Sequence, residues 1–378
     1  MRYFDPPDAD VRHPHPILGL AVADALGMPF ETMTHDNPIL AGWDGETFLA
    51  CEHHGLRPGQ WTDDTQMSLC LAESLIARGA YQVTDAAERY LAWFLSGTAR
   101  GVGGTVRAAL TELGKHGDPH LAGIVGGRGC GTAMRAIPLG VYARGGNGPY
   151  WNLANLERHA HRDARITHRS EEAEDASYIV ASVASSLFHL VNNKYYTEEL
   201  KDWSVTDRIQ SVLMIYKHFN PDSVTYDLLT RSWAFTTDEE IRSLGTSSRA
   251  SEVVATAMAC LVNATSYEEA VVRAIRLGGD TDSRASIVGG WAAIVHPIPL
   301  AWVEGVENLP HLLDVEQRLL AASRPVQRET MTGVFFVAAP RYNTSPVSEG
   351  SKSTDDSPTG TSETSETIDT SVTPSISR

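Results

Sequence analysis

The chain has 378 residues, of which 42% are apolar and 21% charged, and its formal net charge is −16. This composition supplies enough apolar material for a sizeable core. The excess of acids argues against an electrostatic grip on nucleic acid, which requires clustered Lys and Arg. No stretch approaches the roughly 20 apolar residues that span a bilayer, and no signal peptide is recognisable. The four cysteines form no C-x-x-C pair, which fits a reducing compartment. We therefore expect a cytoplasmic protein with free thiols and no membrane partner.

Apolar residues recur with the period of a helix over most of the chain, and strand signals are scarce. The sequence therefore predicts an all-α fold, with one compact multi-helix domain at 13–342 after a flexible N-terminus at 1–12. The best strand signal, at 334–337, is isolated. In chain order, helices are expected at 16–27, 64–78, 84–96, 103–115, 131–143, 151–162, 171–193, 205–218, 246–263, 266–277, 282–295 and 313–322.

The composition changes at residues 343–378. Of these 36 residues, 18 are Ser or Thr, none is aromatic, and six acids face two basic residues. Such a segment cannot bury enough apolar surface to offset the entropy lost on ordering. We expect it to be a disordered acidic tail.

Two short acidic clusters stand where helices are expected to begin. The first is Thr-Asp-Asp at 62–64, and the second is Asp-Thr-Asp-Ser at 280–283, directly after a double glycine. A single acid at a helix start is commonly a cap for backbone N–H groups, but neighbouring carboxylates repel unless solvent or a cation separates them. Carboxylate and hydroxyl oxygens suit Mg²⁺ or Mn²⁺ better than zinc. If the clusters meet in space, they form one hard-metal site.

Five segments form a pattern along the chain: G-L-A-V-A-D-A-L-G-M-P-F-E at 19–31, W-T-D-D-T-Q at 61–66, G-C-G-T-A-M-R at 129–135, Thr167-His168, and G-G-D-T-D-S at 278–283. Their combination and order resemble the motifs of the ADP-ribosylglycohydrolase family over roughly residues 15–300. The resemblance implies an all-α domain whose cleft holds two Mg²⁺ or Mn²⁺ ions. It also implies cleavage of the glycosidic bond between ADP-ribose and a protein side chain, or a related small ADP-ribosyl compound. A monomer is expected.

The resemblance further implies roles for individual residues. The metal ligands it assigns are Thr62, Asp63, Asp64, Asp280, Asp282 and Ser283. The catalytic residues are Glu31, which is a candidate for acid/base or gating work, with Asp63, Asp64 and Asp282. Two dications can bind ribose hydroxyls, lower the pKa of a bound water and stabilise an oxocarbenium-like transition state. The substrate contacts it assigns are Gly127, Gly129, Cys130, Gly131, Met134 and His168.

Several positions depart from the common family pattern. Ala23 replaces a frequent glycine, which costs little in a helix. Gly101 stands where nitrogenase-regulating members carry an aspartate near the substrate, so no acid/base role is expected there. Cys130 replaces the usual asparagine with a weaker hydrogen-bond donor, so ligand contacts should differ. Ser283 keeps the hydroxyl needed for metal ligation, and serine occurs there in the arginine-specific members.

Two other classes of protein remain open at this point. An all-α magnesium-dependent nucleotide phosphohydrolase also uses acid clusters at helix starts and would release phosphate or pyrophosphate. A crystallin-like or ADP-ribose-binding relative would keep the fold without turnover. Zinc is not expected, because the pairs His53-His54 and His159/His161 carry no cysteine partners.

Overall fold

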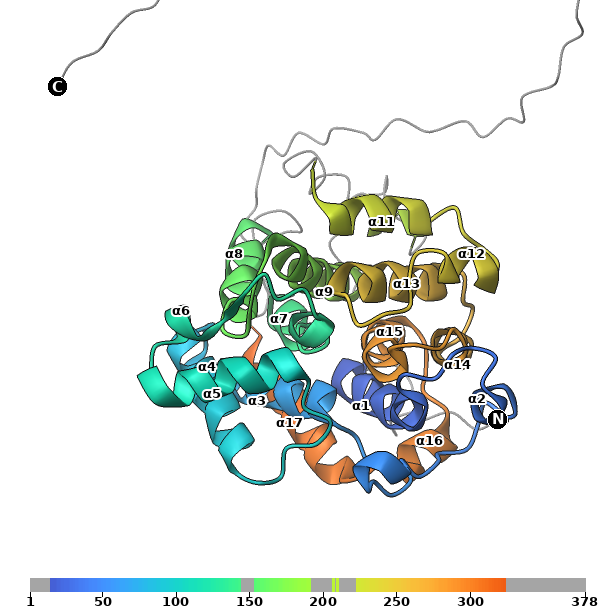
Figure 1. Cartoon of the computed structure of the whole chain (residues 1–378), viewed down its shortest axis with the longest axis horizontal. Coiled ribbons are helices and arrows are strands. Elements are labelled where there is room, and N and C mark those ends of the chain that lie inside the picture. The colour runs from blue at the N-terminus through green and yellow to red at the C-terminus, as the bar shows by residue number, and fades with distance from the viewer. Residues whose placement is uncertain (1–13, 144–152, 192–205, 208, 211–221, 324–378) are drawn as a thin grey trace, which may run out of the picture. The chain divides into compact units, whose positions relative to one another are not determined.

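Helices supply nearly all the regular structure of the described residues (Figure 1). The computed structural model describes residues 14–143, 153–191, 206–207, 209–210 and 222–323, all within the unit Met1–Thr332. The second unit, Gly333–Arg378, lies outside these residues. So do the predicted flexible N-terminus, the acidic tail, the strand at 334–337 and most of the helix at 205–218. The all-α prediction is confirmed, and no described helix is long and apolar enough to cross a membrane.

The elements follow one another in a simple order. The first half of the chain contains α1 (Pro16–Gly27), the 3₁₀ turn η1 (Met28–Phe30), α2 (Pro38–Ala41), η2 (Glu52–His54), α3 (Asp63–Arg78), α4 (Val83–Leu95), α5 (Gly104–His116), α6 (Pro119–Ala122), β1 (Ile124–Val125), η3 (Cys130–Thr132), α7 (Ile137–Ala143), α8 (Leu153–Ala164), β2 (His168–Arg169) and α9 (Glu171–Val191). The second half contains α11 (Val224–Ser232), α12 (Asp238–Arg242), α13 (Ala250–Val262), α14 (Tyr267–Arg276), α15 (Thr281–Val295), α16 (Leu300–Gly305) and α17 (Leu309–Ala322). The two short strands pair in parallel, with Ile124 opposite His168.

Helices α1 and α15 pack against each other near the centre of the described fold, and glycines let their backbones touch (Figure 1). A Cβ built on Gly19 would lie 2.5 Å from the carbonyl oxygen of Gly289, and one built on Gly289 would lie 2.5 Å from the carbonyl oxygen of Gly19. At the end of α1, a Cβ built on Gly27 would lie 2.7 Å from the Cα of Asp282. The C-terminal end of α1 is therefore fixed beside the N-terminal end of α15.

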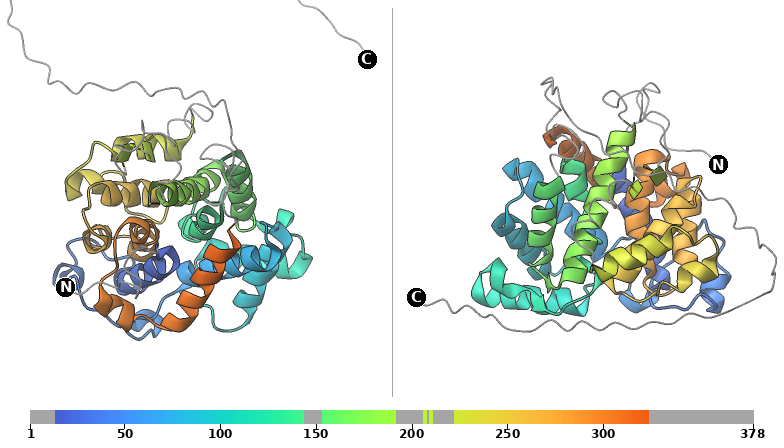
Figure 2. Two further views of the ribbon diagram at one scale, coloured as in Figure 1. Left: turned by 180° about the vertical axis from the view of Figure 1, so that it is seen from behind. Right: turned by 90° about the horizontal axis from the view of Figure 1, so that it is seen from above.

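The other long helices surround this pair, and Figure 2 shows them from two further sides. Helices α9, α13 and α14 contact α15, whereas α3 and α17 contact α1. Apolar residues at helical spacing face inward, as predicted for the third helix, where Met67, Leu71 and Leu75 are fully buried. The packing brings the start of α3 and the start of α15 to the same end of α1.

Two predicted helices begin four or more residues later than expected. The expected helix 131–143 is split into η3 and α7. A continuous helix would place the ring of Pro138 against the carbonyl of Met134 and would lose that backbone bond; Pro138 instead lies in the first turn of α7, where its missing N–H is not needed. The expected helix 246–263 begins only at Ala250. The chain before it bonds to the glycine-rich segment at 126–131, called the glycine loop below, with Cys130 N–H donating to the Ser248 carbonyl at 2.9 Å.

Candidate active site

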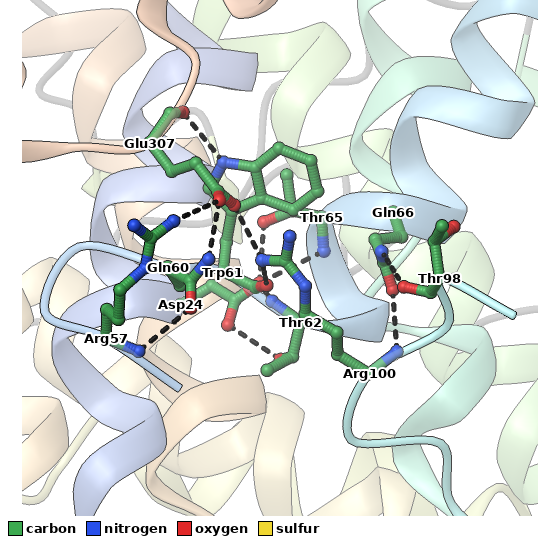
Figure 3. Close-up of polar contacts among 10 residues, drawn as sticks. All are labelled: Asp24, Arg57, Gln60, Trp61, Thr62, Thr65, Gln66, Thr98, Arg100 and Glu307. Carbon is green, nitrogen blue, oxygen red and sulfur yellow. Dashed lines mark hydrogen bonds and ion pairs between the residues drawn. The ribbon is translucent and has the colours of Figure 1, made fainter. Parts of the chain in front are cut away.

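The first acidic cluster begins α3 and is held by Asp24 of α1. The fully buried Asp24 carboxylate accepts hydrogen bonds from the backbone N–H and hydroxyl of Thr62, at 3.0 and 2.8 Å, and from the same groups of Thr65, at 3.2 and 2.6 Å (Figure 3). These bonds satisfy donors in the first turn, as an N-cap side chain does. Since Thr62 donates its hydroxyl proton to Asp24, its oxygen lone pairs are available to another partner. Asp63 and Asp64 follow, and both are buried.

The second cluster begins α15 after a loop that only glycine fits well. Gly278 and Gly279 have φ angles of +75° and +77°, in the left-handed region. Gly279 exchanges backbone hydrogen bonds of 2.7 and 2.8 Å with residues 32–33. The buried guanidinium of Arg284 donates to the carbonyl oxygen of Gly278 at 2.9 Å. The loop is thus fixed from two sides where it delivers Asp280 as the N-cap of α15.

The two clusters meet. The hydroxyl of Ser286, one turn into α15, donates to Oδ1 of Asp64 at 2.7 Å. Burial raises the pKa of Asp64 well above its usual range, and the nearby charges of Asp24, Asp63 and Asp280 raise it further. Burial likewise raises the pKa of Asp63, with a further contribution from Asp24. The carboxylates therefore lie close enough to oppose one another's ionisation.

Asp282 carries a buried oxygen, Oδ1, for which the described residues supply no hydrogen-bond donor. Burial, followed by the charges of Asp280 and Asp64, raises the pKa of this carboxyl well above its usual range. An ionised carboxylate held in this way is costly unless a cation compensates it. Because every donor atom here is a carboxylate or hydroxyl oxygen, the residues fit Mg²⁺ or Mn²⁺.

The aspartates at the two helix starts are more widely spaced than the ligands of a single tightly bound ion. Within the described parts of the chain, the only group of three His, Cys, Asp or Glu side chains with all ligand atoms within 4.8 Å of one another is Glu31, His53 and His54. One ion bound by three of the aspartates would require them to draw together.

Arg100 anchors the loop that lies against the start of α3 (Figure 3). Its guanidinium donates to the Trp61 carbonyl at 3.0 Å and to Oε2 of Glu307 at 2.6 Å, and its backbone N–H donates to Oε1 of Gln66 at 3.0 Å. The guanidinium also lies over the Trp61 ring, 5.3 Å from its centroid. These contacts fix the position of the residue that follows.

That residue, Gly101, lies directly against the acidic site. Its φ angle is +66°, and a Cβ built on it would be 3.0 Å from Oδ1 of Asp63 and 3.1 Å from Cβ of Thr62. The backbone N–H of Gly103 donates to the Asp63 carboxylate. The loop therefore approaches the acids with its backbone and leaves no room for an acidic side chain at Gly101.

Cys130 lies on the second acidic cluster. Its thiol is buried, 3.0 Å from Oδ2 of Asp280 and 3.3 Å from Oγ of Ser283. Burial and the charge of Asp280 raise the pKa of this thiol well above its usual range, so it stays protonated and donates. Cys130 is therefore a neighbour of two predicted metal ligands. Met134, also predicted to contact substrate, is 3% exposed and belongs to the main apolar core.

The three loop glycines surround the imidazole of His168. A Cβ built on Gly127, Gly129 or Gly131 would lie 3.3, 3.1 or 3.0 Å from an atom of that ring. Burial, followed by the charge of Arg135, lowers the pKa of His168 to about 3. The imidazole is therefore neutral at physiological pH and supplies shape and hydrogen bonding without charge.

A fully buried guanidinium supports this arrangement. Arg135 donates to Oδ2 of Asp163 at 2.9 Å, to the Gly131 carbonyl at 2.7 Å and to the Thr167 hydroxyl at 2.9 Å. That hydroxyl lies 2.9 Å from Nδ1 of His168. Arg135 thus ties the glycine loop and the histidine to one ion pair in the core.

Glu31 follows η1 and faces the acidic site from the side. Burial, followed by the charge of Asp280, raises its pKa, and the charge of His53 partly opposes this. Its side chain is 31% exposed, and its Oε2 lies 3.6 Å from Nε2 of His54. Glu31 therefore lies between the aspartates and a pair of exposed histidines.

Sequence reasoning assigned no role to four residues that organise the site. Asp24 had a visible signal, since it is the single acid in the otherwise apolar helix at 16–27. Ser286, Arg135 and Arg284 had none, because their partners are defined only by the folded chain. The structure brings the residues predicted as metal ligands to one end of α1, with Cys130 and Glu31 beside them, while His168 lies under the glycine loop.

This arrangement defines a class of protein, an all-α enzyme scaffold with hard-oxygen ligands at two helix starts and an adjacent glycine loop. The ADP-ribosylglycohydrolase family model matches residues 16–329. The chain belongs to this family. Membership confirms the predicted class of enzyme, a hydrolase of ADP-ribosyl glycosidic bonds.

Known relatives agree in fold and class. The chain is 25% identical over 323 residues to the ADP-ribosylarginine hydrolase Tri1 of Pseudomonas putida, covering 80% of this chain and 76% of Tri1. It is 33% identical over 187 residues to the ADP-ribosyl-[dinitrogen reductase] glycohydrolase of Rhodospirillum rubrum, covering 47% of this chain and 57% of that protein. A solved structure titled ADP-ribosylglycohydrolase-related protein complex matches with a TM-score of 0.64 and 26% identity, over 82% of this chain and 96% of that one.

Proposed function

We propose that this protein hydrolyses the C1″–N glycosidic bond between ADP-ribose and an arginine side chain, using two Mg²⁺ or Mn²⁺ ions. The observation that carries the proposal is the pair of acidic helix starts, where buried Asp64 and Asp282 meet without a basic partner among the described residues. Two relatives named as ADP-ribosylarginine hydrolases support the linkage. The protein substrate itself is left open.

The metal would be held by the oxygens of the two clusters. The proposed ligands are Thr62, Asp63, Asp64, Asp280, Asp282 and Ser283. Oδ1 of Asp282, buried without a donor, supports this set. When bound, such ions supply ribose binding and a water of lowered pKa. Asp24 and Ser286 orient the ligands, because each binds a hydroxyl or carboxylate of the set and leaves its other lone pairs free.

Glu31 is the proposed proton carrier. Burial raises the pKa of this partly exposed carboxyl toward neutral pH, and a pKa near the working pH makes general acid–base catalysis efficient. In the reaction, water adds to C1″ as the C1″–N bond breaks. Glu31 accepts the proton from the water and returns it to the departing guanidine, so the products are ADP-ribose and an arginine guanidinium.

The environment of the bond also favours a cationic leaving side chain. Burial and mutual repulsion hold the acids of this region at raised pKa values, and a guanidinium beside them is attracted by whatever negative charge the ions do not neutralise. Gly127, Gly129 and Gly131 are proposed to contact ADP-ribose, with neutral His168 behind them. Cys130 presents a thiol where an amide is usual, so we expect it to influence substrate affinity.

A panel of substrates tests the proposal. The purified full chain, with Mg²⁺ and Mn²⁺ in turn, is incubated with ADP-ribosyl-arginine, ADP-ribosyl-serine and ATP, and products are separated by chromatography with mass detection. We expect free ADP-ribose and unmodified arginine, with the serine linkage cleaved more slowly. Phosphate or pyrophosphate release without ADP-ribose would instead identify a nucleotide phosphohydrolase. Binding of ADP-ribose without turnover of any substrate would identify a binding protein.

A further inference from the structure

A second set of ligand-type side chains lies beside the acidic site, on a short closed loop. Residues 51–56 are joined by two backbone hydrogen bonds between Cys51 and Leu56, at 3.0 and 2.9 Å. The turn η2 fills the loop, and Gly55 closes it with a φ angle of +65°. Cys51 and Leu56 are buried with Met28 in a small apolar cluster separate from the main core. The loop is therefore fixed on η1, the turn that precedes Glu31.

Three side chains, Glu31, His53 and His54, converge, and Cys51 lies beside one of them, His53. The Cys51 sulfur lies 3.4 Å from Nδ1 and 3.7 Å from Nε2 of His53. Nε2 of His54 lies 3.6 Å from Oε2 of Glu31, and the ligand atoms of Glu31, His53 and His54 all fall within 4.8 Å of one another. The expectation that His53-His54 has no cysteine partner is therefore wrong.

Two of these separations, His54–Glu31 and Cys51–His53, match edges of a tetrahedral metal site. Zinc bonds of about 2.0–2.1 Å to nitrogen or oxygen place two such ligands about 3.3 Å apart in a tetrahedron, and a 2.3 Å bond to sulfur places sulfur about 3.6 Å from nitrogen. The observed His54–Glu31 distance of 3.6 Å and Cys51–His53 distances of 3.4 and 3.7 Å lie near these values. Both histidines are exposed and can turn a ring nitrogen inward without disturbing the core.

We propose that Cys51, His53, His54 and Glu31 form a site for one borderline transition-metal dication such as Zn²⁺. A thiolate and a carboxylate balance its two positive charges, and two neutral imidazoles complete four-coordination. The donor set differs in kind from the all-oxygen set at the helix starts, so the two sites select different metals.

The site would also control the hydrolase, an inference that rests on the proposed function. Glu31 faces Asp280 on one side and His53 and His54 on the other. A carboxylate bound to zinc cannot accept or return a proton. Zinc occupancy therefore inhibits hydrolysis, while the Mg²⁺ ligands at the helix starts stay in place.

Cobalt and zinc binding test the site without any assay of activity. The full chain, saturated with Mg²⁺, is titrated with Co²⁺ and then with Zn²⁺ against a chromophoric chelator. We expect one Co²⁺ per chain with intense visible bands of tetrahedral geometry and a near-ultraviolet sulfur-to-cobalt band. The variant C51S should lose the sulfur band, and H53A/H54A should weaken Zn²⁺ binding more than about 100-fold, beyond the usual effect of an outer-shell change.

The double variant H116A/H120A removes two other exposed histidines and should bind Zn²⁺ as the unchanged protein does. Circular dichroism checks that every variant keeps its helices. Cobalt spectra without a sulfur band, or equal Zn²⁺ affinity in H53A/H54A, would overturn the site.

Zinc inhibition then tests the link to the proposed activity. With Mg²⁺ in excess, zinc should inhibit ADP-ribosyl-arginine hydrolysis by the unchanged chain at concentrations at least about tenfold lower than those needed for H53A/H54A, with each rate expressed relative to that of the same protein without zinc. Equal zinc sensitivity of the two proteins would refute zinc control of hydrolysis, even if the cobalt spectra show that the site binds metal. If neither protein hydrolyses any ADP-ribosyl substrate, the proposed function fails, and the cobalt spectra still decide the metal site.

Discussion

The substitution Asp282→Asn separates two effects of the acidic site: the free energy that it costs the metal-free fold, and the metal binding that it provides. Asp282 is 5% exposed, and its Oδ1 lacks a donor among the described residues. A buried aspartate can take up a proton instead of holding its charge. Its cost to the metal-free fold at pH 7 is therefore capped at about 1.4 kcal/mol for each of the roughly 3 pH units between pH 7 and its ordinary pKa of about 3.9, or about 4 kcal/mol.

Asparagine has the same shape without the charge. We expect D282N to raise the free energy of unfolding of the metal-free protein by about 1 to 4 kcal/mol, which corresponds to roughly 2 °C in melting temperature for each kcal/mol in a chain of this size. The same variant loses a metal ligand. Saturating Mg²⁺, at about 100 times its dissociation constant, stabilises the unchanged protein by about 2.7 kcal/mol, and we expect D282N to lose most of that gain.

Chemical denaturation followed by circular dichroism, in EDTA and in Mg²⁺, measures both effects, and ADP-ribose release measures turnover, which should fall more than about 100-fold. The control D227N alters an aspartate on the surface of α11 and should change stability by less than about 0.5 kcal/mol. If D282N is less stable than the parent in EDTA, the buried Asp282 carboxyl does not destabilise the metal-free fold. If D282N keeps its Mg²⁺ stabilisation and turnover, Asp282 is not a metal ligand.

Three further predictions concern the same region. In Gly101→Ala, the new Cβ lies against Asp63 in a left-handed backbone, so the free energy of unfolding should fall by about 1–2 kcal/mol and turnover about tenfold or more. The control is Gly103→Ala, whose new Cβ meets no atom within 4 Å. Equal turnover rates in the two variants would refute the contact. Gly289→Ala would force α1 and α15 apart and should lower both the Mg²⁺ binding free energy and the free energy of unfolding by about 1–3 kcal/mol. In Gly290→Ala the new Cβ meets the Ile137 side chain, at 3.0 Å, so the loss of stability should be smaller. The denaturation midpoints of the two variants test this difference. The carboxyls of Asp63, Asp64 and Asp282 have raised pKa values, so in the folded chain they keep protons that the unfolded chain has lost. The free energy of unfolding in EDTA should therefore fall as pH rises above about 4, by about 1.4 kcal/mol per pH unit for each carboxyl until its folded pKa is passed. A slope unchanged by Mg²⁺ would contradict this.

Local patterns in the sequence were enough to predict most helices and the two acidic helix starts. Periodicity located α3, and the double glycine before Asp280 indicated a fixed turn, because both signals lie within a few neighbouring residues. The break at Pro138 was visible in the sequence, yet the surrounding apolar period concealed it. The short helices α2, α6, α12 and α16 were missed, since one or two turns carry too little periodicity, and the longer helix α11 was missed as well.

The supporting residues of the site could not be predicted in this way. Arg135 and Arg284 are fully buried, and burial of an arginine depends on carbonyls that the fold brings from elsewhere. The contact of Cys130 with Asp280 joins residues 150 positions apart. Periodicity and capping rules describe neighbours along the chain and carry no information on such pairs.

The placement of the buried cations explains why the acids need a metal. Arg135 donates to the Gly131 carbonyl of the glycine loop, but its charge is already paired with Asp163. Arg284 lies close enough for Asp280 and Asp282 to raise its pKa, although burial lowers that pKa overall, and its donors are committed to carbonyls and to the Thr256 hydroxyl. Neither guanidinium forms an ion pair with the aspartates of the two helix starts among the described residues. The fold therefore keeps its own positive charge away from these carboxylates, so that a dication can bind there without displacing a protein side chain.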